Sequence, residues 1–290
     1  MNREEALALA ERGVEELIAA LEQGKSEQLL EYLAFQARFH RYSFNNCLLI
    51  AIQKPDATYV AGFQRWKEHA RFVRKGEKGI MILAPLMKRT RREENAAPES
   101  GDEEPSPRLV GFRATYVFDV SQTDGEELPQ FSAITGDPSE LVPVLRQLVS
   151  DQGIELRYEE QLGGADGVSE GGRIAIRQGL PAAEEFSVTV HELAHELLHR
   201  SERRKETTRT VRELEAEAVA FVVCRAAGLD GLARSSDYIQ LYQGDKELLL
   251  HSLSHIQRVA AQIIDGLVAS STDCQTAAVA DERLETSVAI

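Results

Sequence analysis

The run His191-Glu192-Leu193-Ala194-His195 constrains the fold of this 290-residue chain more than any other feature. It lies in the apolar stretch FSVTVHELAHELLH, which predicts a partly buried helix over about residues 184–199. A helix advances about 100° per residue, so positions four apart lie on one face, one turn apart. His191 and His195 can therefore present ring nitrogens to a single ion. Because buried polar groups need partners, a second element must face them.

Glu192 follows the first histidine and projects beside such an ion. A zinc ion held by His191 and His195 lowers the pKa of a bound water toward about 7, and Glu192 can take its proton. The sequence thus predicts Zn²⁺ as cofactor and a zinc metallopeptidase with Glu192 as general base. The alternative is a solvated helix that matches the pattern by chance.

The third metal ligand is expected from a second helix, predicted over about residues 208–227. Glu213 and Glu217 lie four apart and face the same way, whereas Glu215 points elsewhere and is expected in solvent. Glu217 precedes the apolar run 218–223, so it lies at the edge of a buried helix. One of Glu213 and Glu217 would bind zinc, and the other could orient a ligand histidine. Both could instead cover an exposed helix face.

The helix contains the metal-binding pattern twice, because His195-Glu196-Leu197-Leu198-His199 also matches it. The three histidines share one face, and they cannot easily reach one ion along a straight helix. We favour the first pair. His199 is expected at the solvent-exposed end of the helix, as a cap or a cation at its C-terminus.

The charge of the chain is unevenly distributed. The net charge is -14, yet residues 38–92 contain 13 Lys and Arg against three Asp and Glu. Aromatic side chains are interspersed among these cations. Single-stranded nucleic acid binds to this combination, because cations neutralise phosphates and exposed aromatic faces stack on bases. The alternative is that the aromatic residues belong to a core and that the basic turn 74–79 is merely solvated.

The segment therefore offers candidate contacts to single-stranded DNA. They are Arg41, Tyr42, Phe44, Asn45, Asn46, Trp66, Arg71, Arg74, Lys75 and Lys78.

Helical and strand patterns predict an α+β chain of two domains. Helices are expected over about 3–33, 45–53, 63–69, 140–152 and 245–269, and strands over 79–84, 112–120, 154–158 and 172–177. The charged, Pro-rich segment 89–108 predicts a flexible loop. An N-terminal α+β domain is expected over 1–130, a mainly helical domain with a small sheet over 138–270, and a disordered tail over 271–290. With no segment approaching the roughly 20 apolar residues that cross a bilayer, the sequence predicts a cytoplasmic protein without a membrane partner.

The C-terminal half resembles zinc metallopeptidases of the ImmA/IrrE type, and more widely the zincins. The shared features are the helix His191–His195 and the later run Glu217-Ala218-Val219-Ala220-Phe221. This resemblance favours Glu217 as the third ligand. The chain departs from the pattern by its second acid, Glu213. The resemblance also implies that strand 172–177, which precedes the metal helix, forms the edge that binds substrate.

The N-terminal half resembles the N-terminal domain of ArdC-type antirestriction proteins over about residues 5–130. The matching pieces are Tyr42–Asn46, Gln53–Asp56, Val60–Phe63, Trp66, Arg71–Gly79 and Tyr116–Thr123. This resemblance implies single-stranded DNA binding and protection of incoming or mobile DNA from restriction.

Three functional hypotheses follow. The leading one is a single-stranded-DNA-binding antirestriction-type protein with a zinc metallopeptidase-like domain, whose partners include DNA and a protein substrate or restriction enzyme. The second is a regulatory zinc protease that cleaves a repressor or another protein. The third is a DNA-binding protein whose zinc site is purely structural.

Overall fold

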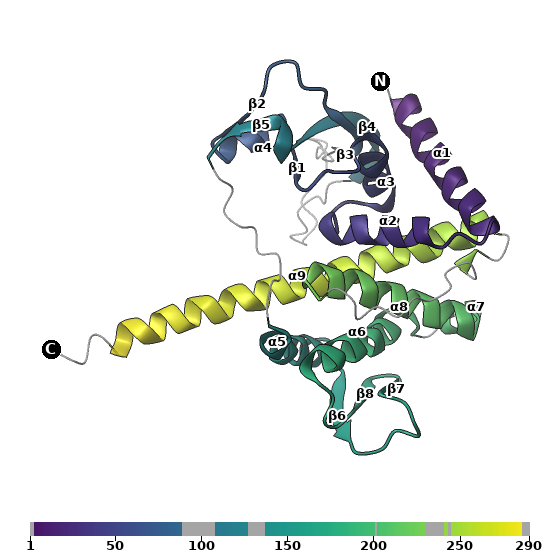
Figure 1. Ribbon diagram of the computed structural model, residues 1–290, viewed down its shortest axis with the longest axis vertical. Helices are drawn as coiled ribbons and strands as arrows, with labels where there is room; N and C mark the ends of the chain where they lie inside the picture. The colour runs from purple at the N-terminus through teal and green to yellow at the C-terminus, as the bar shows by residue number, and fades with distance from the viewer. Residues whose placement is uncertain are drawn as a thin grey trace, which may run out of the picture. The chain divides into compact units, whose positions relative to one another are not determined.

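The computed structural model describes residues 3–88, 108–126, 137–200, 202–229, 241–242 and 245–285, and its mixture of helices and small sheets confirms an α+β chain. The chain divides into two compact units (Figure 1). The first comprises Met1–Glu15 and Asn45–Glu127, and the second comprises Glu16–Phe44 and Leu128–Ile290. The first unit thus ends close to the expected boundary. Residues 16–44, expected in the N-terminal domain, pack with the second unit instead.

The first unit combines short helices with two small antiparallel sheets. Its elements are the N-terminal part of α1 (Arg3–Glu22), α3 (Phe44–Gln53), β1 (Val60–Gly62), α4 (Phe63–Glu68), β2 (Arg71–Val73), β3 (Ile80–Lys88), β4 (Arg108–Asp119), the 3-10 turn η1 (Val120–Gln122) and β5 (Thr123–Gly125). One sheet has the order β1-β4-β3, and β2 pairs with β5 in the other. Of the loop predicted over residues 89–108, residues 89–107 lie outside the described part of the chain.

Helix α3 stabilises the first unit by bonding to the outer strand of the larger sheet. Asn46 donates from Nδ2 to the Leu83 carbonyl at 2.9 Å and accepts from the Leu83 N–H at 2.8 Å. Gln53 makes the same pair of bonds with Met81, at 2.9 and 3.0 Å. The two amides lie seven residues apart, hence on one helix face, and they match two alternate residues of the strand. They therefore satisfy an edge that would otherwise lack a partner strand.

The second unit is mainly helical. Its elements are α2 (Glu27–Arg38), α5 (Pro138–Asp151), β6 (Glu155–Glu159), β7 (Gly167–Ser169), β8 (Arg173–Arg177), α6 (Ala182–Leu198), α7 (Glu202–Glu206), α8 (Arg209–Ala226) and α9 (Lys246–Glu285). Helix α6 lies against α8, α5 and the small sheet. Its residues Phe186, Val190 and Leu193 are fully buried at helical spacing, which orients the opposite face, with its histidines, toward α8.

The small sheet corrects one expectation about substrate binding. Its order is β6-β8-β7, with β6 and β8 parallel and β7 and β8 antiparallel. Strand β8, which covers all but the first residue of the predicted strand 172–177, is thus the central strand and has no free edge. The edge beside α6 belongs to β7, a strand of three residues that is too short for a clear alternating pattern.

Two helical predictions also differ from the structure. The helical pattern over 3–33 forms two helices because Gly24 adopts a φ of 76°, and the Lys25 N–H bonds to the Ala20 carbonyl at 2.9 Å, which ends α1. Helix α9 continues to Glu285, where a disordered tail was expected from 271. Residues 270–285 contain neither Gly nor Pro, so nothing stops a helix already formed upstream. Residues 286–290 lie outside the described part. No described helix is both long and apolar enough to span a membrane.

We predict that Asn46→Ala destabilises the first unit. The substitution leaves the Leu83 N–H and carbonyl unpaired at a buried edge, which costs about 1–3 kcal/mol. Thermal unfolding followed by circular dichroism should show a lower midpoint, by about 4–8 °C for each kcal/mol. The control is Asn45→Ala, because the neighbouring Asn45 is exposed. Equal midpoints for the two variants would contradict the edge-bonding role of Asn46.

Candidate functional site

Three potential ligand atoms converge between α6 and α8. His191 Nε2 and His195 Nε2 are 3.1 Å apart. Glu213 Oε2 lies 3.7 Å from the former and 3.5 Å from the latter. Among the described residues, this is the group of acidic, histidine and cysteine side chains whose donor atoms come close enough to hold a metal ion.

The spacing of these atoms fits a metal ion. Ligand atoms of a tetrahedral zinc ion, with bonds of about 2.0–2.1 Å, are about 3.3–3.4 Å apart. The observed separations of 3.1, 3.5 and 3.7 Å bracket that value. Two neutral imidazoles and one carboxylate are also a donor set that zinc accepts. Glu213 is 52% exposed, so the site opens toward solvent on the side of α8.

Glu217 lies on the other side of the first histidine. Its Oε2 is 3.5 Å from His191 Nδ1, the ring nitrogen that faces away from the three converging atoms. From the sequence pattern alone, either Glu213 or Glu217 could be the third metal ligand, and the resemblance to metallopeptidases favours Glu217. In the structure Glu213 reaches both Nε2 atoms, and Glu217 is placed to orient the His191 ring.

Glu192 is buried beside the histidine pair and below the edge strand β7. The two elements approach so closely that a side chain at Gly167 would begin 2.8 Å from Glu192 Cγ and 2.6 Å from Val188 Cγ1. Glycine at this position therefore allows β7 to lie next to α6. Burial raises the pKa of Glu192, although His191 and His195 act against the shift.

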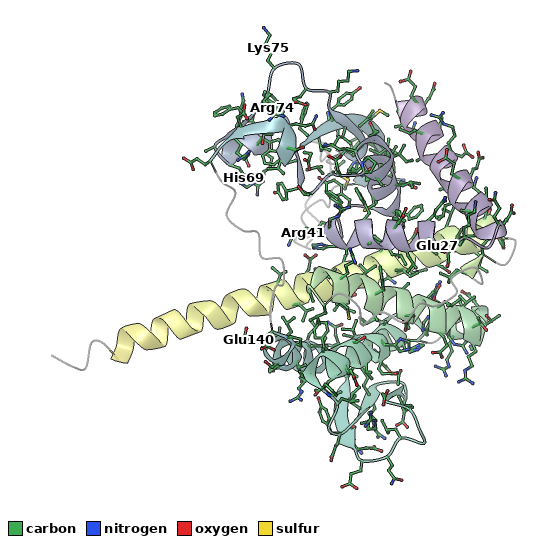
Figure 2. The ribbon with its side chains drawn as sticks, viewed as in Figure 1. Glu27, Arg41, His69, Arg74, Lys75 and Glu140 are labelled. Carbon is green, nitrogen blue, oxygen red and sulfur yellow. The ribbon has the colours of Figure 1, made fainter. Side chains whose placement is uncertain are left out.

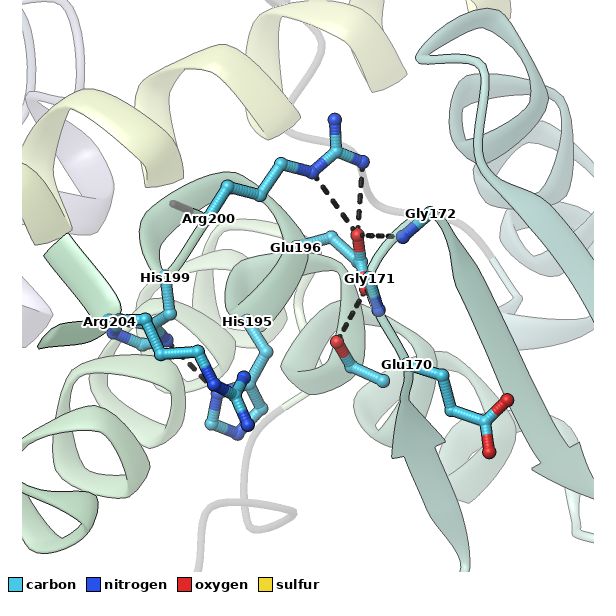
Figure 3. Close-up of a pocket in the computed structure, with 9 residues that line it drawn as sticks. Glu170, Gly171, Gly172, His195, Glu196, His199, Arg200 and Arg204 are labelled. Carbon is cyan, nitrogen blue, oxygen red and sulfur yellow. Dashed lines mark hydrogen bonds and ion pairs between the residues drawn. The ribbon is translucent and has the colours of Figure 1, made fainter. Parts of the chain in front are cut away.

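Glu196, the acid of the second overlapping pattern, has a structural environment. Its carboxylate accepts bonds from Ser169 Oγ at 2.6 Å and from the Gly171 and Gly172 amides at 2.8 and 2.7 Å, and it pairs with Arg200 at 3.0 Å. Both glycines have positive φ, so successive amides point at one carboxylate. Figure 3 shows Glu196 facing this turn. It fastens the turn between β7 and β8 to α6.

His199 and Glu215 are both buried, whereas the sequence predicts both side chains in solvent. His199 caps the C-terminus of α6, as one interpretation predicts, but its side chain is fully buried. Its Nε2 lies 2.9 Å from Oε2 of Glu215, which is also fully buried and forms an ion pair with Arg203. The sequence did not reveal this cluster, because the partner of a histidine at a helix end depends on which helix packs over it.

A cavity of about 560 Å³ opens beside His195. It is lined by Ser169, Glu170, Gly171, Gly172, His195, Glu196, His199, Arg200 and Arg204. Figure 3 shows the turn after β7 on one side and α6 on the other. Thus the open space adjoins His195, and an edge strand and the buried carboxylate of Glu192 lie beside the same helix.

The first unit contains most of the candidate DNA contacts, and the structure separates them into buried and exposed groups. Trp66 is fully buried, donates from Nε1 to the Phe118 carbonyl at 2.9 Å and packs edge-on against Tyr59. Asn46 bonds to strand β3. Phe44, which belongs to the second unit, is buried against Tyr32. These three side chains are not placed to contact DNA as predicted, because they pack or bond inside their units.

Three further candidates are engaged within the protein. Arg71 donates from Nε to Thr123 Oγ1 at 2.8 Å and so links β2 to β5. In the second unit Arg41 pairs with Asp265 at 2.9 Å, and the half-buried Tyr42 packs edge-on against Phe39. Arg41 and Tyr42 therefore do not belong to the same compact unit as the basic turn.

The basic turn Arg74–Gly79 presents the remaining cations. Arg74 pairs with Glu77 at 2.8 Å, whereas Lys75 and Lys78 are exposed and have no ion pair within the part of the chain that the structure describes. Figure 2 shows Lys75 pointing away from the strands at the tip of the turn. Asn45 is also exposed, on α3.

Two exposed aromatic residues adjoin this turn, and they were not among the predicted contacts. Phe72, on β2 just before the turn, is 60% exposed. Tyr116 is 42% exposed and lies against Gly79, where a side chain would begin 2.9 Å from its Cβ. The alternation of buried and exposed positions along β2 and β4 could have identified these two residues only if the neighbouring strands were known. Exposed cations and exposed aromatic side chains therefore do occur together, but the exposed aromatic residues are Phe72 and Tyr116, not the buried Phe44 and Trp66.

The segment Asp119–Thr123 holds the basic turn in place. Gln122 donates from Nε2 to the Lys78 carbonyl at 2.8 Å and to Glu77 at 3.1 Å. Asp119, almost fully buried, accepts from the Thr58, Tyr59 and Ser121 amides, and these bonds outweigh burial and lower its pKa.

Residues 8–118 match the family model described as the N-terminal domain of anti-restriction factor ArdC. The match includes the basic turn, Phe72 and Tyr116, and it extends over the segment 16–44 that packs with the second unit.

The ArdC likeness extends beyond this domain in solved structures. The metal-free crystal structure of the antirestriction ArdC protein from plasmid R388 matches 90% of this chain and 98% of that chain, with a TM-score of 0.53 and 20% identity. The Mn(II)-bound structure of the same protein matches with a TM-score of 0.50. At this identity the likeness shows a shared fold.

One curated relative is a longer protein. The uncharacterised protein pXO2-81 of Bacillus anthracis is 27% identical over an alignment of 250 residues that covers 73% of this chain and 42% of the relative. The chain thus spans less than half the length of that protein.

We predict that His191 titrates near pH 9 in the metal-free protein. Burial acts to lower its pKa, but the Glu213 and Glu217 carboxylates outweigh it and raise the pKa to about 9. Since this is above the unfolded value of about 6.5, the interaction stabilises the fold fully below about pH 6.5, and this stabilisation is lost as pH rises through about 9.

Ring NMR signals of His191, followed against pH, measure this midpoint. Glu213→Gln should lower it, whereas Glu140→Gln on α5, an exposed acid away from the site, should leave it unchanged. A wild-type midpoint at or below the unfolded value would contradict the proposed convergence of carboxylates on His191.

Proposed function

We propose that this chain is an antirestriction protein that combines a single-stranded-DNA-binding ArdC-type domain with a zinc-dependent peptidase centre. The convergence of His191 Nε2, His195 Nε2 and Glu213 Oε2 carries the peptidase part of the proposal. The match of residues 8–118 to the ArdC domain model supports the DNA and antirestriction parts. A protein partner, such as a restriction enzyme that acts on incoming DNA, is the proposed substrate.

The proposed metal ligands are His191, His195 and Glu213, with Glu217 holding the His191 ring through Nδ1. An ArdC protein has been crystallised with Mn(II), which supports a metal-binding role for this fold. We propose zinc because a set of two imidazoles and one carboxylate is typical of catalytic zinc sites.

The residues around the site have distinct proposed roles in peptide hydrolysis. A divalent ion bound here supplies Lewis acidity toward a peptide carbonyl and water. Glu192 takes the proton of the attacking water on its carboxylate and later delivers it to the leaving amine. Because burial raises its pKa, this carboxylate is a better match to proton transfer near neutral pH than an exposed glutamate.

The surroundings of Glu192 fit an extended peptide. Strand β7 has a free edge beside α6, where a substrate segment could add as a further strand through main-chain hydrogen bonds. The cavity beside His195 can accept a side chain of that segment. Both features would be unnecessary for a metal that only joins two helices, so they favour catalysis over a purely structural ion.

The proposed DNA surface is the basic turn with its two exposed aromatic neighbours. Lys75 and Lys78 would neutralise phosphates, and Phe72 and Tyr116 would stack on unpaired bases. In this proposal the ArdC-type domain brings the peptidase centre to proteins that act on the same strand.

We predict that Glu192→Gln separates metal binding from hydrolysis. The substitution keeps the shape of the side chain but removes the proton acceptor, so the turnover rate should fall about 10²–10⁴-fold. Zinc content, measured by inductively coupled plasma mass spectrometry, should stay at the wild-type level. The probe is fluorescein-labelled casein incubated with zinc-loaded protein.

The double variant His191→Ala, His195→Ala is the control, because it should lose both zinc and cleavage. Zinc in the wild type without any cleavage would favour the structural-metal hypothesis. Equal zinc in the wild type and the double variant would contradict the metal site itself.

For the DNA surface, we predict that Lys75→Ala with Lys78→Ala weakens binding to a labelled oligo(dT) strand. The slope of log affinity against log salt concentration should decrease in magnitude by up to about 1.4, since each lost phosphate contact changes it by about 0.7. Phe72→Ala should weaken binding by about 1–3 kcal/mol while leaving that slope nearly unchanged, because stacking releases no counterions.

Lys25→Ala with Lys205→Ala is the matched control, since it removes the same charge from exposed positions in the second unit. Fluorescence anisotropy at two or more salt concentrations measures all four proteins. An equal loss of affinity in both double variants would indicate a general charge effect and contradict a specific surface.

A further inference from the structure

His199 lies directly behind the proposed ligand His195, and the two rings are in contact. The distance between His195 Nδ1 and His199 Nδ1 is 3.1 Å. On its other side His199 Nε2 lies 2.9 Å from Glu215 Oε2, and the second oxygen of Glu215 pairs with Arg203. The His199 and Glu215 side chains are both fully buried. The four residues thus form one continuous row of hydrogen bonds that leads away from the site.

The carboxylate of Glu215 determines which atom donates and which accepts in each hydrogen bond of this row. Glu215, paired with Arg203, can only accept, so the proton on His199 must lie on Nε2. A neutral imidazole then has an unprotonated Nδ1 that accepts from His195 Nδ1. His195 in turn carries its proton on Nδ1, and its Nε2 keeps an unprotonated lone pair.

The lone pair of His195 Nε2 points to where a metal would bind. His195 Nε2 is the atom that lies 3.1 Å from His191 Nε2 and 3.5 Å from Glu213 Oε2. A metal-binding histidine usually donates its other ring N–H to a carboxylate or carbonyl, which fixes its tautomer and orientation. In this chain a second histidine occupies that position, and the carboxylate lies one step further away.

We propose that His199, held by Glu215 and Arg203, is a positioning residue that fixes the tautomer and ring orientation of His195 for metal binding. The proposal rests on the metal site described under the proposed function. It also explains why the overlapping pattern His195-Glu196-Leu197-Leu198-His199 does not compete for the ion. His199 turns both ring nitrogens to protein partners, and Glu196 is bound to the β7–β8 turn.

The test compares zinc affinity in His199→Phe and His199→Asn with that of the wild-type full-length protein. Phenylalanine fills the space but cannot accept a hydrogen bond, so the zinc dissociation constant should rise about 10–100-fold. Asparagine places an amide oxygen near the former Nδ1 and should recover most of the affinity. Competition with a chromophoric chelator measures these constants without any substrate.

Leu198→Ala is the matched control for loss of packing. Leu198 is buried at the adjacent position at the end of α6 and has no polar contact with His195. It should lower thermal stability but leave the zinc dissociation constant within about two-fold of the wild type, well below the effect expected for a lost outer hydrogen bond.

A second readout concerns the tautomer itself. In the metal-free wild type, ¹⁵N NMR should show an unprotonated Nε2 and a protonated Nδ1 on His195, and His199→Phe should give a mixture of tautomers. A purely structural role for His199 predicts no such change. If His199→Phe does not fold, Glu215→Gln keeps the side-chain shape and should weaken zinc binding in the same direction.

The outcomes are distinguishable. A wild-type protein that binds no zinc contradicts the proposed metal site, and the positioning role with it. Zinc binding in the wild type that is unchanged by His199→Phe or by Glu215→Gln overturns the positioning role alone. The same holds if His199→Asn binds no better than His199→Phe, or if Leu198→Ala weakens binding equally.

Discussion

The packing of α8 against α6 is the interaction on which the candidate site depends. Helix α6 carries His191, His195 and His199 in one row, and α8 faces that row with glutamates at alternate positions, 213, 215 and 217. Imidazoles removed from water need polar partners, and each of these rings has a carboxylate within 3.7 Å of a ring nitrogen. The same contact that joins the two helices therefore brings the proposed ligands together and buries His199 and Glu215 behind them.

The small sheet completes the site from the opposite side of α6. Glu196 fastens the β7–β8 turn through two glycine amides and Ser169, and Gly167 lets β7 approach Glu192. The helix is thus held on both faces, with α8 on one side and the sheet on the other. An edge strand and a cavity remain open next to the histidine pair, as a peptide substrate would require. Rigid support of this kind is what a binding site built on helices and strands needs.

Helical spacing alone was enough to identify the pair His191 and His195, because residues four apart must share a face. It could not choose between Glu213 and Glu217, which also share a face. Which of the two lies near both Nε2 atoms depends on their height along α8 relative to the histidines, and that is a property of helix packing. Composition likewise indicated cations and aromatic residues together, but it could not tell that Trp66 is fully buried while Phe72 is largely exposed. The role of Asn46 depends on a strand edge 37 positions later. Long, periodic elements were therefore predictable, and the side-chain roles set by contacts distant in sequence were not.

Anomalous X-ray diffraction from crystals of the zinc-loaded protein, recorded on both sides of the zinc absorption edge, tests the central claim most directly. The account predicts a single strong peak at about 2.0–2.2 Å from His191 Nε2, His195 Nε2 and a Glu213 oxygen, with His199 and Glu215 still bonded to each other behind it. A peak between His195 and His199, a peak bound by Glu217 in place of Glu213, or no peak in the second unit would contradict it.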